Sequence, residues 1–227
     1  MDGSADLRAR LRAVVAQRME TDPAHDLAHL DRVWVNAQAI ADDQTDMPVL
    51  LAASYLHDLV NLSKDDPERH LASRRSARES EPILAKLGYF PDQIRAIQHA
   101  IEAHSFSANI TPESPEACIL RDADRLDALG AIGIARNFSV SGALGRSLYD
   151  PADPFAAHRP LDDLTYSLDH WKVKLLSLPA DMMTEGGKAV AQIRVQRMIR
   201  FLEEFSEEIG NALPADWISD EPLIFPK

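Results

Sequence analysis

The chain has 227 residues, and its 45% hydrophobic content is enough to bury a sizeable core. Its 24 basic and 36 acidic side chains give a formal net charge of −12, which opposes binding to nucleic acid polymers and anionic membranes. The single cysteine, Cys118, excludes a fold held by intrachain disulfides. No apolar run reaches the roughly 18 residues that cross a bilayer, and no signal-peptide pattern opens the chain, so we expect a soluble cytoplasmic protein.

Apolar residues recur at helical spacing along nearly the whole chain, and no convincing strand pattern interrupts them. The spacing predicts an all-α fold in a single helical domain. The helices are expected at residues 5–20, 26–42, 47–60, 68–87, 92–104, 115–136, 161–177 and 186–210. Residues 105–116 and 141–160 have the composition of loops, and the second is long enough to act as a lid or specificity loop.

The third predicted helix is apolar on several sides but runs into an adjacent histidine and aspartate. In the segment LLAASYLHDLVNLSK, His57 falls on the same helical face as Leu50 and Ala53, and Asp58 lies one step round. Both side chains are therefore expected to be largely buried. A buried carboxylate without a positive partner is costly and tends to take up a proton. The pair therefore predicts a cation or another positive group beside it.

Other histidines are expected to reach the interior from neighbouring helices. His29 shares a helical face with Asn36, and His25 lies on the same side, so one of the two histidines can point inward. His104 continues the apolar face of its helix, whereas His99 points the opposite way and is expected to be solvated. A lone inward histidine is more often hydrogen-bonded in a core than bound to a metal. These histidines therefore indicate a metal only as a set.

Three aspartates accompany the apolar face of the predicted helix 115–136. Asp124 and Asp127 flank one edge of that face and Asp122 flanks the other, and periodicity does not choose between Asp124 and Asp127. Salt bridges on a helix surface are the ordinary explanation of such residues. Two imidazoles and two carboxylates that converge would suit Mn²⁺, Fe²⁺, Co²⁺, Ni²⁺ or Zn²⁺ better than an all-oxygen Mg²⁺ or Ca²⁺ site. Such an ion could activate water and polarise a phosphate.

Four motifs carry these residues in the order H…HD…D. They read HDLAHLDRVWVNA, LHDLVNLSK, HSFS and RDADRLDALGAIGIAR. In these motifs the chain resembles the HD superfamily of metal-dependent phosphohydrolases, and the similarity continues through DHWKVKLLSLP and MTEGGKAVAQIRVQRM. The resemblance implies an all-helical HD core at about residues 22–136, a C-terminal helical extension at about 160–212, and a metal in a helical cleft.

The same resemblance implies which residues bind the metal. The ligands carry over as His29, His57, Asp58 and Asp124. His25 is then a neighbour of the site, and Asp122 and Asp127 lie behind it or on the helix surface. Manganese is the favoured ion for this ligand set, with Mg, Co, Ni, Fe or Zn as alternatives.

The HD proteins that this chain most resembles are associated with cleaving nucleoside triphosphates to the monophosphate and pyrophosphate. The resemblance therefore implies a small phosphorylated substrate, a nucleotide. Two alternatives stay open. One is a phosphomonoesterase or phosphodiesterase that acts on nucleotides at the same metal, and the other is a metal- or nucleotide-binding regulatory module without turnover. Neither a nucleic acid polymer nor a membrane is expected as a partner, and the sequence leaves a homodimer open.

Four residues are candidates for catalysis beside the metal. Asp58 could orient or deprotonate the attacking water. Lys64 and Arg69 follow the His-Asp pair and could neutralise the charge of the bound phosphate, although solvated side chains are the ordinary alternative for both. His104 could protonate the leaving group or contact the phosphate. HD proteins with an acidic pair a few residues after the doublet have a candidate acid or base there, but this chain has Asn61 in that place.

Overall fold

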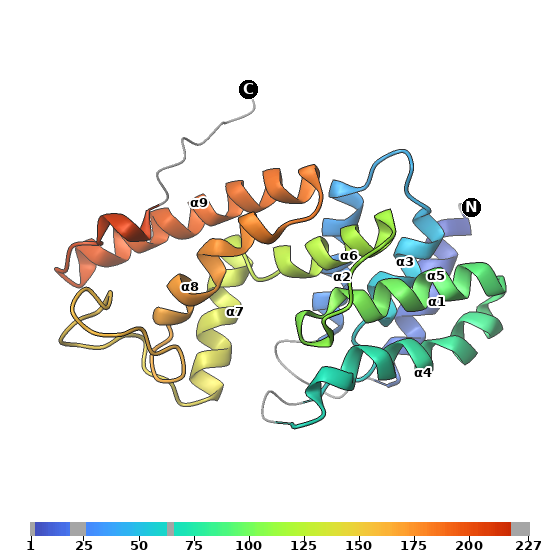
Figure 1. The fold of residues 1–227 in the computed structure, drawn as a ribbon, viewed down its shortest axis with the longest axis horizontal. Helices are drawn as coiled ribbons and strands as arrows, with labels where there is room; N and C mark the ends of the chain where they lie inside the picture. Colours follow the sequence, from blue (N-terminus) through green and yellow to red (C-terminus); the bar gives the residue numbers. More distant parts are fainter. Residues whose placement is uncertain (1–2, 19–25, 63–65, 219–227) are drawn as a thin grey trace. The chain divides into compact units, whose positions relative to one another are not determined.

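The structure of the chain is a computed structural model that describes residues 3–18, 26–62 and 66–218. These residues form helices and no β-sheet, which confirms the all-α fold (Figure 1). The α-helices are α1 (Gly3–Ala16), α2 (Leu27–Ile40), α3 (Met47–Leu56), α4 (Ala72–Leu87), α5 (Pro91–His104), α6 (Pro115–Leu126), α7 (Gly130–Ala143), α8 (Asp169–Val173) and α9 (Glu185–Glu208). The 3₁₀ helices are η1 (Arg69–Leu71), η2 (Phe106–Ala108), η3 (Leu175–Asp181) and η4 (Ala215–Trp217). None of the described helices is long and apolar enough to cross a membrane.

The chain divides into two compact units, residues 1–125 and 126–227, and the first is built around α3. Every residue of α3 from Val49 to Leu56 is buried. It packs against α1, α2, α4 and α5, and the last two lie side by side (Figure 1). A core helix therefore delivers His57 and Asp58, which follow it directly. The organisation as one domain, with an HD core and an extension, stays a prediction.

Capping side chains set where two helices of the first unit begin. Asp26 accepts a hydrogen bond from the backbone N–H of His29 at 2.8 Å, which places His29 in the first turn of α2. Asp46 accepts the backbone N–H of Val49 at 3.1 Å at the start of α3. The N–H of Asp46 in turn donates to the buried carboxylate of Glu116 on α6 at 2.8 Å. The start of α3 is therefore tied to α6.

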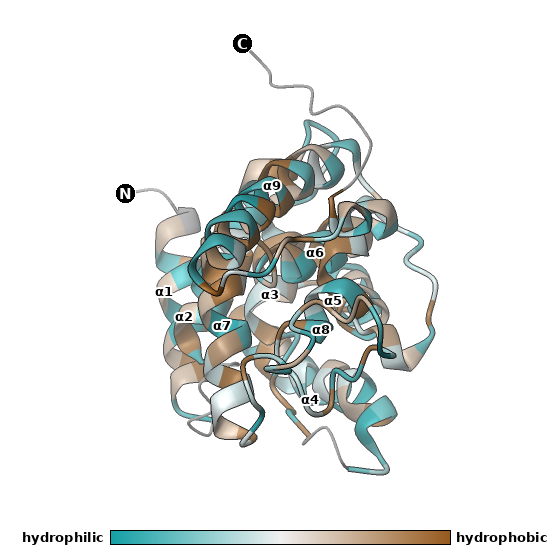
Figure 2. Cartoon of the chain, turned by 90° about the vertical axis from the view of Figure 1, so that its left-hand side faces the viewer, coloured by the Kyte–Doolittle hydropathy of each residue, from teal (hydrophilic) through white to brown (hydrophobic). Residues whose placement is uncertain are grey.

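Aromatic rings fill the core of the second unit. The ring centroid of the buried Trp171 lies 5.9 Å from that of Phe138 on α7 and 5.7 Å from that of Phe201 on α9. Rings at these separations attract one another beyond their hydrophobic burial. Along α9, hydrophobic and hydrophilic bands alternate (Figure 2), as expected for a helix with one face on a core.

The prediction of one helix over residues 115–136 is wrong, because the chain turns between α6 and α7. Gly130, the first residue of α7, has a φ of +70°, which costs glycine little. A Cβ on Gly133 would lie 2.2 Å from the carbonyl oxygen of Ala128, so the backbone can approach this closely only at a glycine. The apolar spacing continues across the turn, which is why periodicity did not reveal it.

The predicted helix 161–177 is also wrong over its first half. Only α8 and η3 are helical there, and the residues before α8 belong to a long loop, 144–168, which we call the Arg159 loop. Within it, the Asp162 carboxylate accepts the backbone N–H groups of Leu164 and Thr165 at 3.1 and 3.2 Å. Such local hydrogen bonds compete with those of a helix.

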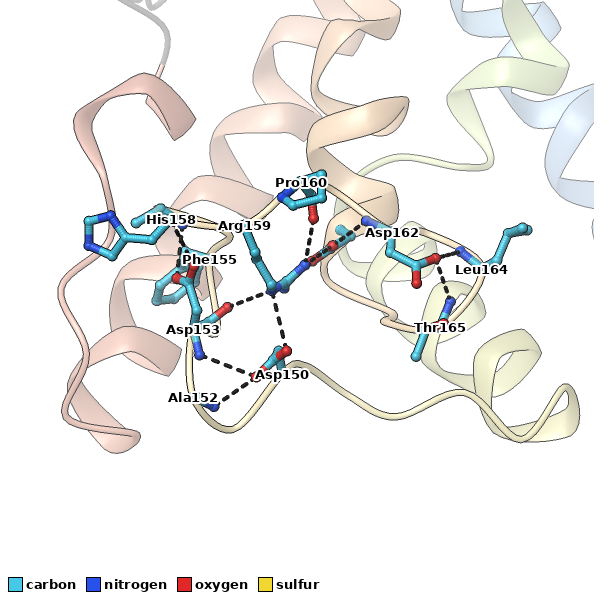
Figure 3. Close-up of polar contacts among 12 residues, drawn as sticks. Asp150, Ala152, Asp153, Phe155, His158, Arg159, Pro160, Asp162, Leu164 and Thr165 are labelled. Carbon is cyan, nitrogen blue, oxygen red and sulfur yellow. Dashed lines mark hydrogen bonds and ion pairs between the residues drawn. The ribbon is translucent and has the colours of Figure 1, made fainter.

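The Arg159 loop is organised by the side chain from which it takes its name (Figure 3). The guanidinium donates two hydrogen bonds to the fully buried Asp169, at 2.5 and 2.9 Å, and lies 3.5 Å from Asp150. Asp150 accepts the N–H of Ala152 at 2.8 Å, so it is bonded by the loop backbone as well. Charge-assisted hydrogen bonds therefore hold the loop in one conformation. A lid function for it stays a prediction.

Candidate metal site

Five predicted site residues come together in the first unit, and we call them the His-Asp cluster. His29 lies in the first turn of α2, His57 and Asp58 follow α3, His104 ends α5 and Asp124 lies in α6. Their donor atoms form two overlapping groups, His29–His57–Asp124 and His57–Asp58–His104, and within each group the atoms lie within 4.8 Å of one another. The structure therefore assembles the four expected ligands and places His104 beside them.

Nε2 of His29 and of His57 lies farther from the two carboxylates than the roughly 2.7–3.2 Å that a hydrogen bond spans. Nε2 of His29 lies 3.5 Å from Asp124 Oδ1 and 3.8 Å from Asp58 Oδ2. Nε2 of His57 lies 3.5 Å from Asp58 Oδ2 and 3.9 Å from Asp124 Oδ1. Two ligands bound to one metal at about 2.1 Å are separated by about 3.0–3.4 Å in octahedral or tetrahedral geometry. The observed spacing therefore leaves room for a cation between the groups.

His57 is held in the form that can bind a metal. The ring is fully buried, and Nδ1 donates to the Ser54 carbonyl at 3.0 Å, since a carbonyl can only accept. Nε2 therefore carries the lone pair, and it has no hydrogen-bond partner among the described residues. Burial lowers the pKa of His57 to about 4, against the opposing effect of Asp58, so the ring is neutral near pH 7. A buried, neutral nitrogen with an unused lone pair fits a metal ligand.

His104 faces the other oxygen of Asp58. Its Nδ1 donates to the Ile101 carbonyl at 2.6 Å, and its Nε2 lies 3.7 Å from Asp58 Oδ1. Burial lowers the pKa of His104, but the carboxylates of Asp58 and Asp124 outweigh burial and raise the pKa above the ordinary histidine value. His104 therefore holds a proton more readily than His57 does.

Of the residues expected to contact the phosphate or flank the metal, Arg69 is described, whereas Lys64 and His25 lie outside the described residues. Arg69 is half-buried in η1, and its guanidinium donates to the Leu62 carbonyl at 2.7 Å. It therefore ties η1 to the backbone of Leu62. Its contact with a substrate stays a prediction.

Burial decides between the two alternatives left for Asp122 and Asp127. They are 0% and 1% exposed, which excludes a place on the helix surface. The guanidinium of Arg136 donates to the Asp127 carboxylate at 2.7 Å and balances its charge. His99 is partly exposed, and its Nε2 accepts the backbone N–H of Glu113 at 3.0 Å.

Sequence reasoning missed the backbone acceptors that orient two of the histidines. Ser54 and Ile101 each lie three residues before the histidine whose Nδ1 they bind. Carbonyls in the last turn of a helix are available to such donors. Any residue type would supply the same carbonyl oxygen, so residue identity carried no signal. The helix expected over residues 47–60 also hid the helix end at His57, because α3 ends at Leu56.

Comparison with known proteins shows the family. Residues 26–129, which contain the whole His-Asp cluster, match the HD domain. YpgQ of Bacillus subtilis is 30% identical over 190 residues, which cover 82% of this chain and 84% of YpgQ. A crystal structure of YpgQ in complex with ADP superposes with a TM-score of 0.69 at 26% identity, over 90% of this chain and 96% of that one.

A second solved structure, an HD-superfamily hydrolase from Bacillus thuringiensis, superposes with a TM-score of 0.71 at 31% identity. It covers 92% of this chain, and the match includes 100% of the Bacillus thuringiensis chain. The similarity thus extends well beyond the cluster, whose histidines and aspartates could hold a metal. This chain belongs to the HD superfamily of hydrolases.

Proposed function

We propose that this protein is a metal-dependent phosphohydrolase that cleaves nucleoside triphosphates to the monophosphate and pyrophosphate. The observation that carries the proposal is the His-Asp cluster, whose imidazole nitrogens and carboxylate oxygens lie 3.5 to 3.9 Å apart. A nucleotide substrate is supported by YpgQ, which has a crystal structure in complex with ADP. The net charge of −12 is consistent with a bound cation that attracts an anionic substrate.

We assign the metal to His29, His57, Asp58 and Asp124. Mixed nitrogen and oxygen donors suit Mn²⁺, Fe²⁺, Co²⁺, Ni²⁺ and Zn²⁺ better than Mg²⁺, and of these ions we propose Mn²⁺. When bound, a divalent ion would supply Lewis acidity, which activates water and offsets the charge that develops on the phosphate. The protein contributes rigid placement of these donors, because α3 is buried along nearly its whole length.

In this proposal Asp58 and His104 handle the protons. One oxygen of Asp58 faces His57 and the other faces His104. Asp58 can therefore orient the attacking water and also stabilise the protonated form of His104. The raised pKa of His104 suits it to protonate the leaving group. Lys64 and Arg69 are assigned to the phosphate oxygens.

Product analysis tests the reaction. Protein loaded with Mn²⁺ is incubated with nucleoside triphosphates, and phosphate and pyrophosphate are measured separately. We expect pyrophosphate and nucleoside monophosphate in equal amounts, and no turnover after chelation with EDTA. Phosphate alone would indicate a phosphomonoesterase, and turnover of cyclic nucleotides would indicate a phosphodiesterase. Binding of a nonhydrolysable triphosphate without turnover under any of the six metals would indicate a regulatory module.

A further inference from the structure

Asn36 is a buried amide on the same face of α2 as His29. It is 4% exposed and lies between the fully buried Val33 and Ala37 along that helix. Its Nδ2 donates a hydrogen bond to the backbone carbonyl of Ala123 on α6 at 3.0 Å. Burying an amide among apolar residues is costly unless it finds a hydrogen bond. The bond to α6 therefore explains why a polar side chain occupies this place.

The Ala123 carbonyl directly precedes the candidate ligand Asp124. Helix α2 therefore meets α6 at two consecutive residues. Asn36 bonds the Ala123 carbonyl. His29 Nε2 lies 3.5 Å from Asp124 Oδ1. His29 and Asn36 are separated by about two helical turns, so both project from one face of α2. Two contacts along one face limit both sliding and rotation of α6 against α2.

We propose that Asn36 is a positioning residue that holds α6 in register with α2, so that the Asp124 carboxylate faces the imidazoles at the spacing a cation needs. The inference rests on the metal site proposed above. Hydrophobic contacts have no preferred direction, so apolar packing alone would let the two helices shift. A hydrogen bond is confined to about 2.7–3.2 Å, which is within the tolerance of about 0.5 Å that a metal site requires.

The place of this contact on α6 follows from where that helix ends. The last four carbonyls of an α-helix lack the intrahelical partners that interior carbonyls have. Helix α6 ends at Leu126, so Ala123 and Asp124 share its last turn, and the Ala123 carbonyl accepts a donor from another helix there. A side-chain donor at this point therefore acts on the turn that carries the ligand.

The test separates metal binding from stability. Asn36→Leu replaces the amide by an apolar side chain of similar volume. Asn36→Ser leaves a hydroxyl that is too short to reach α6 and that bonds a carbonyl of α2 instead. The matched control is Asn137→Leu, because Asn137 on α7 also donates from Nδ2 to a backbone carbonyl, that of Ser167, at 3.3 Å, but belongs to the second unit. For each protein, the dissociation constant of Mn²⁺ is measured by titration calorimetry, and unfolding of the metal-free form is measured in urea.

We expect both Asn36 variants to bind Mn²⁺ about 10- to 100-fold more weakly, as found for residues that orient metal ligands. Asn137→Leu should bind Mn²⁺ as the wild type does, even if it unfolds more easily. Unchanged Mn²⁺ affinity in the Asn36 variants, or an equal loss in Asn137→Leu, would overturn the positioning role. If Asn36→Leu does not fold, Asn36→Ser decides. Failure of the wild type to bind Mn²⁺ would instead refute the metal site, and this role with it.

Discussion

The His-Asp cluster and the Arg159 loop both gather carboxylates, but they use them differently. In the loop, Asp150 accepts a backbone N–H at 2.8 Å, and Arg159 donates two hydrogen bonds to Asp169, the first residue of α8, at 2.5 and 2.9 Å. In the cluster, Asp58 and Asp124 face imidazole nitrogens at 3.5 to 3.9 Å, beyond hydrogen-bond length. Carboxylates that accept strong hydrogen bonds hold a loop together, whereas carboxylates spaced around imidazole lone pairs can share a cation. The two regions are distinguished by the distance from each carboxylate oxygen to the nitrogen that it faces, and the number of acidic residues does not distinguish them.

The substitution with the greatest effect should be one that removes a nitrogen donor from the His-Asp cluster. His57→Ala removes the nitrogen that both donor groups share, so we expect loss of bound Mn²⁺ and a fall in kcat/KM of more than about 100-fold, beyond that of residues that only orient ligands. Metal content by mass spectrometry and pyrophosphate release measure the two effects. The matched control is His158→Ala in the Arg159 loop, which should keep both. Retention of metal and activity by His57→Ala would remove the basis of the site assignment.

A smaller loss is expected when the ion pair that holds the Arg159 loop is removed. Arg159→Met leaves the buried Asp169 without its cation, and removing one partner of a buried pair costs about 3 kcal/mol of unfolding free energy. Urea denaturation measures this loss. Arg95→Met is the control, because Arg95 pairs with Asp92 at the surface, where an ion pair contributes less than about 1 kcal/mol. Equal losses in the two variants would show that the Arg159 contact adds no more than a surface pair.

Adding Mn²⁺ tests whether the His-Asp cluster is the region that gains stability from a cation. A ligand that binds only the folded state stabilises it by about 2.7 kcal/mol at 100 times its dissociation constant. Mn²⁺ at this excess should therefore raise the Tm of the wild type and of Arg159→Met, but not that of His57→Ala. Calorimetry with and without Mn²⁺ measures the shift. A shift that persists in His57→Ala would place the stabilising ion elsewhere in the chain.

The change in stability should be smallest when Asp150 and Asp153 of the Arg159 loop are titrated with acid. The backbone N–H of Ala152 chiefly lowers the pKa of Asp150, and that of His158 chiefly lowers the pKa of Asp153. Because each folded-state pKa lies below the unfolded value, the stability that these contacts contribute is complete above the ordinary carboxyl range. It is lost as the pH falls through the folded-state pKa.

Nuclear magnetic resonance can follow this titration at the amides themselves. The amide proton shifts of Ala152 and His158 should change with midpoints below 3.8, the ordinary aspartate pKa. Asp150→Asn should abolish the transition at Ala152 and leave that at His158. Midpoints at or above the ordinary value would mean that the backbone does not bind these carboxylates in solution.

Helical periodicity placed some residues of the cluster and left others open. It predicted that His57 and His104 face inward, and both are buried. It could not separate His29 from His25, nor Asp124 from Asp127, because the helical spacing expects both members of each pair on one side. Those choices came from the family resemblance, and the structure groups His29 and Asp124 with His57.

Periodicity failed where a polar contact or a glycine overrides the apolar pattern. The apolar spacing continues past the turn before Gly130, although α6 ends there and α7 begins with glycine at a positive φ. The carboxylate of Asp162 replaces helical hydrogen bonds over residues that look amphipathic. Both features depend on local geometry that a count of apolar positions does not measure.

Patterning along the chain was enough to predict the all-helical fold, a buried helix that carries the His-Asp pair and the types of residue available to a metal. These follow from the direction in which each side chain leaves its own helix. Three contacts could be seen only in the folded structure: Asn36 meets the carbonyl before Asp124, Arg159 neutralises Asp169, and His104 shares Asp58 with His57. Contacts of this kind depend on the distance between separate segments, and periodicity within a segment carries no information about that distance.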